Sequence, residues 1–117
     1  MAIGVDIEDI ERFKGKSEAF LNRVFTPLEL EYCNKFNHPE SHLAARFCAK
    51  EAVVKALTAL EILNISYNEI EVFHNENKCP QIRILKKLEN EIIFQVSLSH
   101  DHTKAIAFVT AEFAPIK

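Results

Sequence analysis

Hydrophobic residues recur along this chain with two spacings, helical in the first half and strand-like in the second. Ala2 to Asp6 is a short apolar run that predicts a strand. Apolar residues three or four apart then predict two short helical segments, the first with Ile7, Ile10 and Phe13 and the second with Phe20, Leu21, Val24 and Phe25.

Two stronger helix signals follow. Thr26-Pro27-Leu28-Glu29 supplies an N-cap, a first-turn proline and a capping-box glutamate, and the helix should end between Cys33 and Phe36. Asn37-His38-Pro39 interrupts the chain, and a long helix is predicted from about Glu40. Its expected apolar stripe consists of Leu43, Phe47, Val54, Leu57 and Leu60.

Alternating patterns in the second half predict strands at Ser66 to His74, Gln81 to Leu85, Ile92 to Leu98 and Ala105 to Phe113. Polar segments at 75–78 and 100–104 join these strands in pairs. Helices early and strands late indicate α+β architecture, with an antiparallel sheet packed against one long and several short helices. The length of 117 residues favours a single domain over 1–117.

The composition narrows the class of protein. A hydrophobic content of 48% is enough for one core, and a net charge of -3 argues against binding nucleic acid. The chain has no apolar run of about 18 residues, so no membrane span is expected. The acidic start of the chain lacks the pattern of a secretory signal, which indicates a cytoplasmic protein.

Cysteines and histidines give no metal or disulfide pattern. Cys33, Cys48 and Cys79 include no Cys-x-x-Cys pair, and the first two are expected to be buried as small hydrophobic residues. Four histidines lack the spacing of metal ligands and are expected on the surface: His38, His42, His74 and His102.

Asp6 and Glu51 are the most informative residues, because each lies in an apolar segment where an unpaired carboxylate is unfavourable. If both face one cleft, they form a hard-oxygen site suited to Mg²⁺. Each also has a structural interpretation. Asp6 could be the N-cap of a turn starting near Ile7, and Glu51 could pair with Lys55 on one helix face.

Arg46, Lys50 and Lys55 surround Glu51 in the sequence, and such a cluster suits a diphosphate with its metal ion. The segment Ser99-His100-Asp101 has the composition of a catalytic triad. However, neighbouring side chains of an extended chain point to opposite faces, which excludes that arrangement. Ser99 and His100 are better interpreted as a phosphate-contacting strand end.

A basic segment stands out in this acidic chain. Between Arg12 and Arg23 the local charge is +3, from Arg12, Lys14, Lys16 and Arg23 against Glu18. The segment is either a solvated helix face or a docking patch for an acidic partner.

Three blocks of the sequence together resemble the bacterial holo-acyl-carrier-protein synthases, the small 4′-phosphopantetheinyl transferases. The blocks are Gly4-Val5-Asp6-Ile7 with Arg12 beyond it, Arg46 to Ala52 continuing through Lys55-Ala56-Leu57, and Val96-Ser97-Leu98-Ser99-His100. Their order and spacing follow the family over nearly the whole chain.

The resemblance implies a reaction in support of fatty acid biosynthesis. Coenzyme A would donate 4′-phosphopantetheine to a serine of apo acyl carrier protein, and adenosine 3′,5′-bisphosphate would leave. By resemblance, Asp6 and Glu51 bind Mg²⁺, Glu51 is the candidate general base, and Lys55 stabilises the transferring phosphoryl group.

The resemblance also assigns the remaining candidates. Arg46, Lys50, Ser99 and His100 would hold the phosphates of coenzyme A. The basic segment of Arg12, Lys14, Lys16 and Arg23 would dock the acidic carrier protein. The family forms homotrimers with active sites between subunits, so these residues need not converge within one chain.

The chain departs from the family pattern after Leu57. The family usually has a Gly-Thr-Gly loop near coenzyme A, whereas this chain reads Thr58-Ala59-Leu60-Glu61-Ile62. Without glycine, the helix should continue past Leu57 and the cofactor contact should change. The alternative function is therefore a catalytically weakened module that binds coenzyme A or a carrier protein.

Overall fold

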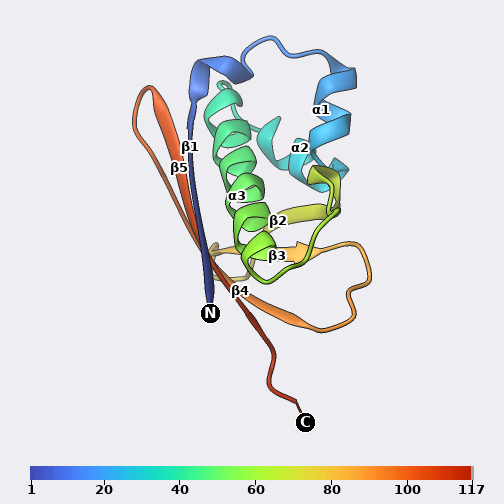
Figure 1. The fold of residues 1–117 in the computed structure, drawn as a ribbon. Helices are drawn as coiled ribbons and strands as arrows, with labels where there is room; N and C mark the ends of the chain where they lie inside the picture. Colours follow the sequence, from blue (N-terminus) through green and yellow to red (C-terminus); the bar gives the residue numbers. More distant parts are fainter. Residues whose placement is uncertain (117) are drawn as a thin grey trace.

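The computed structural model describes residues 1–116 and consists of a long central helix enclosed by two antiparallel sheets and several short helices (Figure 1). In chain order the elements are β1 (Ala2–Asp9), η1 (Ile10–Phe13), α1 (Glu18–Val24), α2 (Pro27–Cys33), α3 (Glu40–Ala59), η2 (Tyr67–Glu69), β2 (Ile70–His74), β3 (Pro80–Ile84), β4 (Ile92–His100) and β5 (Lys104–Phe113). Among the described residues no helix is long and apolar enough to cross a membrane.

The strands form two separate sheets. One has three strands in the order β1-β5-β4, and the other is the β2-β3 hairpin. Every strand pair is antiparallel, and β1 pairs with β5 along its whole length, from Ala2 opposite Ala111 to Asp9 opposite Lys104. The α+β class predicted from the sequence is confirmed, with two sheets instead of one.

Helix α3 lies across the inner face of the three-stranded sheet and forms the core of the molecule (Figure 1). Most of its residues from Leu43 to Leu57 are buried, including many outside the expected stripe. A helix that is apolar on nearly all sides needs partners on all sides. Helices α1 and α2 and the β2-β3 hairpin cover the sides that the sheet leaves open.

Small residues set the distance between α3 and the sheet. Four inward-facing residues of β5 are fully buried, namely Ala105, Ala107, Val109 and Ala111. On β1, a Cβ atom added to Gly4 would lie 1.9 Å from the carbonyl oxygen of Ala52. Only glycine permits this close approach.

Two predicted elements have different boundaries from those observed. Strand β1 continues to Asp9, so Ile7 points outward from a strand and does not belong to the helical turn of Ile10 and Phe13. The predicted strand at Ser66 begins only at Ile70, because residues 67–69 form a 3-10 turn. In both segments the hydrophobic spacing fits a helical turn as well as a strand, and the backbone hydrogen bonds decide between the two.

Other local predictions are confirmed. Thr26 and Glu29 form the expected capping box at the start of α2, and Cys33 and Cys48 are fully buried. Helix α3 continues past Leu57, as the missing glycines predicted. The chain then turns through Glu61, which has a positive φ of 63°.

The outer face of the three-stranded sheet is apolar, and no element within residues 1–116 covers it (Figure 1). Its exposed residues come from β1 and β5: Ile3, Val5, Ile7, Ile106 and Phe108. Val5 pairs with Phe108 and Ile7 pairs with Ile106, so the side chains form one continuous patch. A contiguous apolar surface of this kind is typical of a protein interface.

The close contact at Gly4 gives a first prediction. Gly4→Ala places a methyl group against the Ala52 carbonyl, so α3 must move away from β1. We expect roughly 1–3 kcal/mol of destabilisation from this overpacking, measured by urea unfolding.

Gly15→Ala is the matched control, since Gly15 has a φ of 64° but no atom within 4 Å of an added Cβ. Gly15→Ala should destabilise the protein by about 1–2 kcal/mol, the cost of a left-handed conformation for a residue with a Cβ atom, with no added packing strain. A Gly4→Ala protein as stable as the wild type would contradict the packing argument.

Candidate active site between β1 and α3

Three carboxylates lie near one another where β1 passes α3, and we call Asp6, Glu8 and Glu51 the carboxylate cluster. Asp6 and Glu8 are two residues apart on β1, so both face inward, and their side chains are 13% and 12% exposed. Glu51 faces them from the middle of α3. Because Asp6 lies within β1, the alternative that it caps a helix is wrong.

Asp6 is only partly satisfied by the protein. The Nζ atom of Lys55 lies 3.6 Å from its Oδ1 atom and donates a hydrogen bond to the carbonyl of Val5 at 2.8 Å. The Oδ2 atom of Asp6 is buried and has no hydrogen-bond partner within residues 1–116. The fit of Asp6 to a cation rests on this atom, since a buried carboxylate oxygen without a partner is costly.

Glu8 belongs to the site although the sequence analysis did not single it out. Burial, followed by contact with the Asp6 carboxylate, raises the pKa of Glu8 to about 7, while the charge of Arg12 opposes the shift. Arg12 forms an ion pair with Glu8. The signal in the sequence was the two-residue spacing from Asp6, which places both carboxylates on one face of a strand.

Glu51 is held by a tyrosine rather than by the expected lysine. The hydroxyl of Tyr67 donates a hydrogen bond to Oε1 of Glu51, whereas Lys55 pairs with Asp6. The hydrogen bond to Glu51 and the burial of the ring raise the pKa of Tyr67 to about 12, so the phenol stays a proton donor. The surface pair Glu51–Lys55 is therefore not formed.

The donor chemistry of the carboxylate cluster fits a hard divalent cation. Carboxylate oxygens are the protein ligands that Mg²⁺ prefers, with water and phosphate at its other positions. Within residues 1–116, histidine, cysteine, aspartate and glutamate form no ready group of three around one point. A cation here would thus be held by few protein ligands, as is usual for Mg²⁺ bound with a phosphate substrate.

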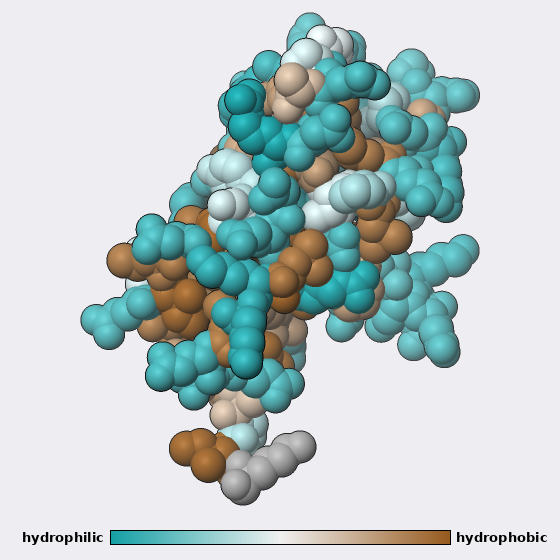
Figure 2. All heavy atoms as spheres, turned by 90° about the vertical axis from the view of Figure 1, so that its right-hand side faces the viewer, coloured by the Kyte–Doolittle hydropathy of each residue, from teal (hydrophilic) through white to brown (hydrophobic). Residues whose placement is uncertain are grey.

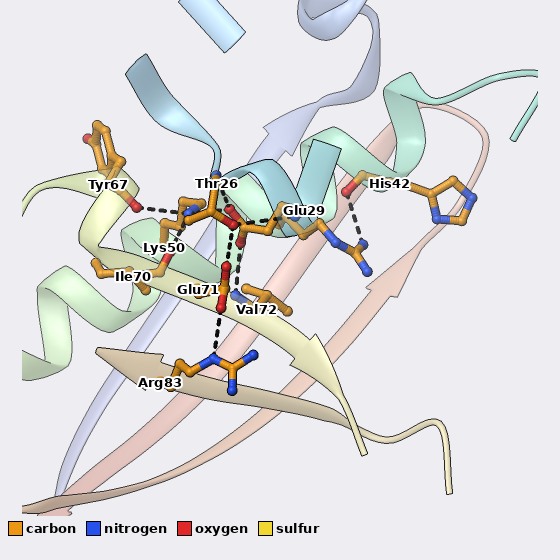
Figure 3. Close-up of polar contacts among 10 residues, drawn as sticks. Thr26, Glu29, His42, Lys50, Tyr67, Ile70, Glu71, Val72 and Arg83 are labelled. Atoms are coloured by element: carbon orange, nitrogen blue, oxygen red, sulfur yellow. Dashed lines mark hydrogen bonds and ion pairs between the residues drawn. The ribbon is translucent and has the colours of Figure 1, made fainter. Parts of the chain in front are cut away.

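Lys50 lies in the core, where it faces Glu29 of α2 (Figure 3). Its Nζ atom is 2.7 Å from Oε1 of Glu29, and neither side chain is exposed. The ammonium also donates to the carbonyls of Tyr67, at 2.8 Å, and Ile70. With its three donors used by Glu29 and two backbone carbonyls, Lys50 has none left for a coenzyme A phosphate, which argues against that prediction.

The ion pair is part of a longer buried network. Glu29 also accepts from the backbone N–H groups of Thr26, at 2.9 Å, and Val72, at 2.8 Å. The Thr26 hydroxyl donates to Glu71 at 2.5 Å, and Arg83 pairs with the other Glu71 oxygen at 2.7 Å. The network joins α3, α2 and the β2-β3 hairpin, and Figure 3 shows it in a single view.

Arg46 lines a pocket of about 280 Å³ between α2, α3 and the β2-β3 hairpin. The residue is only 3% exposed, yet its Nε and Nη2 atoms have no partner among the described residues. Its guanidinium lies over the ring of Tyr32, 4.1 Å from the centroid, and Lys35, His74 and Arg83 also line the pocket. The third nitrogen, Nη1, donates to the carbonyl of His42 at 3.3 Å, and the acidic Glu31 also lines the pocket. A guanidinium with two unpartnered nitrogens among mainly basic neighbours fits an anionic group.

The two remaining residues assigned to phosphate binding point in opposite directions. Ser99 faces the outer, solvent side of the sheet, opposite Ile106, whereas His100 is paired with the inward-facing Ala105. The charge of His100 lowers the pKa of His42, after burial and Arg46, so His100 lies near the Arg46 end of α3. Ser99 thus does not join Arg46 within one chain.

Two histidines are less exposed than predicted. His42 stacks on Phe36 with ring centroids 3.7 Å apart, and His74 stacks on Tyr32 at 4.8 Å. Burial, followed by the charge of Arg46, lowers the pKa of both. They form aromatic contacts beside the Arg46 pocket, while His38 and His102 are exposed as expected.

The basic segment lies at the η1–α1 end of the molecule. All four cations, Arg12, Lys14, Lys16 and Arg23, are exposed. Only Arg12 has an ion-pair partner within the described residues, namely Glu8. The side that carries α1 and α2 is largely hydrophilic in its upper part (Figure 2).

Comparison with known proteins assigns this arrangement to a family. The profile of the 4′-phosphopantetheinyl transferase superfamily matches residues 2–109. The holo-[acyl-carrier-protein] synthase of Thermodesulfovibrio yellowstonii is 42% identical over 111 residues, which cover 92% of this chain and 94% of that protein.

Solved structures agree with the sequence comparison. The Bacillus anthracis holo-(acyl-carrier-protein) synthase in complex with CoA (3′,5′-ADP) matches with a TM-score of 0.78 and 26% identity, covering 97% of this chain and 96% of that one. The Helicobacter pylori holo-[acyl-carrier-protein] synthase in complex with coenzyme A matches with a TM-score of 0.76 and 28% identity, covering 94% and 99%.

The buried position of Lys50 gives a second prediction. Lys50→Met leaves the Glu29 carboxylate buried without its cation, and we expect a loss of about 3–5 kcal/mol in unfolding free energy. Urea unfolding of the variant measures this loss.

The double variant Lys50→Met with Glu29→Gln removes the stranded charge as well and should recover part of the stability. Lys87→Met, at an exposed lysine, is the control and should change stability by less than about 0.5 kcal/mol. A Lys50→Met protein as stable as this control would show that the ion pair is dispensable.

Proposed function

This chain belongs to the 4′-phosphopantetheinyl transferase superfamily, and we propose that it is a Mg²⁺-dependent holo-[acyl-carrier-protein] synthase. It transfers 4′-phosphopantetheine from coenzyme A to a serine of apo acyl carrier protein, in support of fatty acid biosynthesis. The relatives and solved structures that match nearly the whole chain carry this name. The observation that carries the proposal is the buried, unpartnered Oδ2 atom of Asp6 beside Glu51 and Lys55.

In this proposal Asp6 and Glu51 hold the Mg²⁺ ion, and Glu8 adds negative charge beside them. The ion would neutralise charge on the diphosphate of coenzyme A. The pKa of Glu8 is raised first by burial and then by the neighbouring Asp6 carboxylate, and both effects would be relieved by a cation bound beside them. The preference of hard cations such as Mg²⁺ for carboxylate oxygens also supports a cation at this cluster.

The protein side chains supply the rest of the chemistry. Glu51 is the proposed general base for the attacking serine hydroxyl. The side chain of Lys55 is 54% exposed and its ammonium lies beside Asp6, so it can reach the transferring phosphoryl group and stabilise its charge. Phosphorus bonds to the serine oxygen as its bond to the bridging oxygen of the diphosphate breaks, and adenosine 3′,5′-bisphosphate leaves.

Arg46 is the main candidate for holding coenzyme A phosphates, because its guanidinium is unsatisfied and lines the basic pocket. His100 lies near the same end of α3 and is proposed to contact the phosphates together with Arg46. We leave Lys50 out of this set, since Glu29 and backbone carbonyls use its donors. Ser99 remains a candidate through a neighbouring subunit, because it points out of the sheet.

We propose that the protein is a homotrimer with active sites between subunits. The apolar patch on the outer face of β1 and β5, centred on Val5 and Phe108, supports burial against another copy. Ser99 lies on the same face, opposite Ile106, so such packing would bring it toward a neighbouring site. This arrangement accounts for the separation of Ser99 from Arg46 within one chain.

The exposed cations Arg12, Lys14, Lys16 and Arg23 are proposed to dock the acidic carrier protein. Arg12 lies closest to the reaction, since its Glu8 partner belongs to the carboxylate cluster. The three cysteines are free and one is exposed, which is usual in a reducing compartment. We accordingly propose a cytoplasmic location.

The alternative is a weakened module that binds coenzyme A or a carrier protein without efficient transfer. The glycine-free segment 58–62 motivates this alternative, because Glu61 takes a left-handed conformation in which its side chain occupies space that glycine would leave open. The two functions differ in one measurable outcome, which is covalent transfer.

Intact mass of apo acyl carrier protein, after incubation with this protein, coenzyme A and Mg²⁺, tests the main proposal. We expect the mass to increase by one phosphopantetheine, and EDTA to abolish the increase. Asp6→Ala and Glu51→Ala should each remove activity, because each deletes a proposed metal ligand, while the circular dichroism spectrum remains that of the wild type.

No mass increase with several carrier proteins, together with retained coenzyme A binding by calorimetry, would favour the weakened module. Normal turnover of Asp6→Ala or Glu51→Ala would contradict the metal assignment. Lys87→Met, exposed and outside the proposed site, serves as the variant that keeps full activity.

Arg12→Ala tests the docking role. The loss of one exposed docking charge should raise the KM for the carrier protein about three- to tenfold, as expected for roughly 1 kcal/mol of surface electrostatics, and leave the KM for coenzyme A nearly unchanged. The carrier-protein effect should shrink at high salt. Equal increases for both substrates would count against docking.

A further inference from the structure

We propose that Tyr67 is a positioning residue that fixes the Glu51 carboxylate and thereby sets the affinity of the site for its divalent cation. The inference rests on the proposed function, in which Glu51 is a metal ligand. Tyr67 itself touches neither substrate in this view. It acts through the hydrogen bond from its hydroxyl to Oε1 of Glu51.

Tyr67 is the only hydrogen-bond donor to the Glu51 side chain within residues 1–116. Lys55 and Arg12, the two cations nearby, serve Asp6 and Glu8 instead. Without Tyr67, the Glu51 side chain would have no partner that selects one of its rotamers. A glutamate that must be ordered when it binds a ligand loses affinity through side-chain entropy.

The backbone of Tyr67 is anchored from inside the protein. Its carbonyl accepts a hydrogen bond from Lys50 at 2.8 Å, and Lys50 is itself held by Glu29 in the core (Figure 3). The turn that carries Tyr67 is closed by a capping box, in which Ser66 N–H donates to Glu69 at 2.9 Å. The buried network therefore supports the residue that orients Glu51.

The ring of Tyr67 is fixed as well. It packs against Phe47 with ring centroids 5.3 Å apart, and Phe47 precedes Glu51 by one helical turn on α3. Anchoring at the carbonyl and packing at the ring leave the hydroxyl little freedom. The hydroxyl therefore approaches Glu51 from a direction determined by the fold.

A phenol also suits this position electrostatically. A cation paired with Glu51 would neutralise the carboxylate and compete with a metal ion for it. Tyr67 orients Glu51 with a neutral donor, so the carboxylate cluster keeps its negative charge. Because the hydroxyl occupies Oε1, the second oxygen of Glu51 is left for a cation, as in metal sites where an outer hydrogen bond orients a ligand.

Tyr67→Phe tests this role, because it removes the hydroxyl and keeps the ring contact with Phe47. The readout is binding of Mn²⁺ as a paramagnetic substitute for Mg²⁺, followed by the electron spin resonance signal of free Mn²⁺, with coenzyme A present and no carrier protein. We expect the dissociation constant for Mn²⁺ to rise about 10- to 100-fold, the usual effect of losing an outer-shell partner. The thermal unfolding midpoint should stay close to that of the wild type.

Arg12→Ala is the matched control, since it also removes a donor to the carboxylate cluster, but one that carries positive charge. General electrostatics predicts unchanged or tighter Mn²⁺ binding for Arg12→Ala, in contrast to Tyr67→Phe. Weaker binding in Tyr67→Phe alone, with normal stability, supports the proposal.

Unchanged or tighter Mn²⁺ binding by Tyr67→Phe would overturn the positioning role while leaving the proposed function intact. A parallel loss of stability and Mn²⁺ binding would instead reduce Tyr67 to a structural residue. If the wild-type protein binds no Mn²⁺ with coenzyme A, both the metal assignment and this inference fall.

Discussion

The close packing of α3 against β1 is the constraint on which the rest of the structure depends. Gly4 and the alanine-rich inner face of β5 let the helix approach until the Ala52 carbonyl lies where a Cβ atom of residue 4 would be. At that distance, Glu51 and Lys55 on the helix come within reach of Asp6 on the strand. A larger residue on either surface would separate the groups that the proposed chemistry needs together.

Each charged side chain of a helix that is buried on nearly all sides needs a partner, and the charged residues of α3 meet this need in two ways. Lys50 is fully satisfied by Glu29 and two backbone carbonyls, so its charge stabilises the junction of α3, α2 and the β2-β3 hairpin. Arg46 retains two donor atoms without a partner among residues 1–116. Lys50 therefore has a structural role, whereas the charge of Arg46 is available to a ligand, although the two residues look alike in the sequence.

The three-stranded sheet has a different role on each face. Its inner face carries Asp6 and the small residues that receive α3, whereas its outer face presents an apolar patch and Ser99. Because side chains alternate along a strand, a chain that builds a site on one face places the neighbouring residues on the other. The division of the expected phosphate contacts between the two faces follows from this geometry and supports the proposed assembly.

The sequence by itself determined the features that depend on local chemistry. These are the capping box of Thr26 and Glu29, the long helix from Glu40, its extension past Leu57, and the unusual positions of Asp6 and Glu51. Resemblance supplied the family, which the match over residues 2–109 bears out. Only the tertiary structure decided the partner of each charged side chain. Lys50 forms an ion pair with Glu29, Lys55 forms one with Asp6, and Glu51 accepts a hydrogen bond from Tyr67. The two members of each pair lie on different elements, so the packing of those elements sets the distance between them. The spacing of residues along a single helix or strand does not encode that packing.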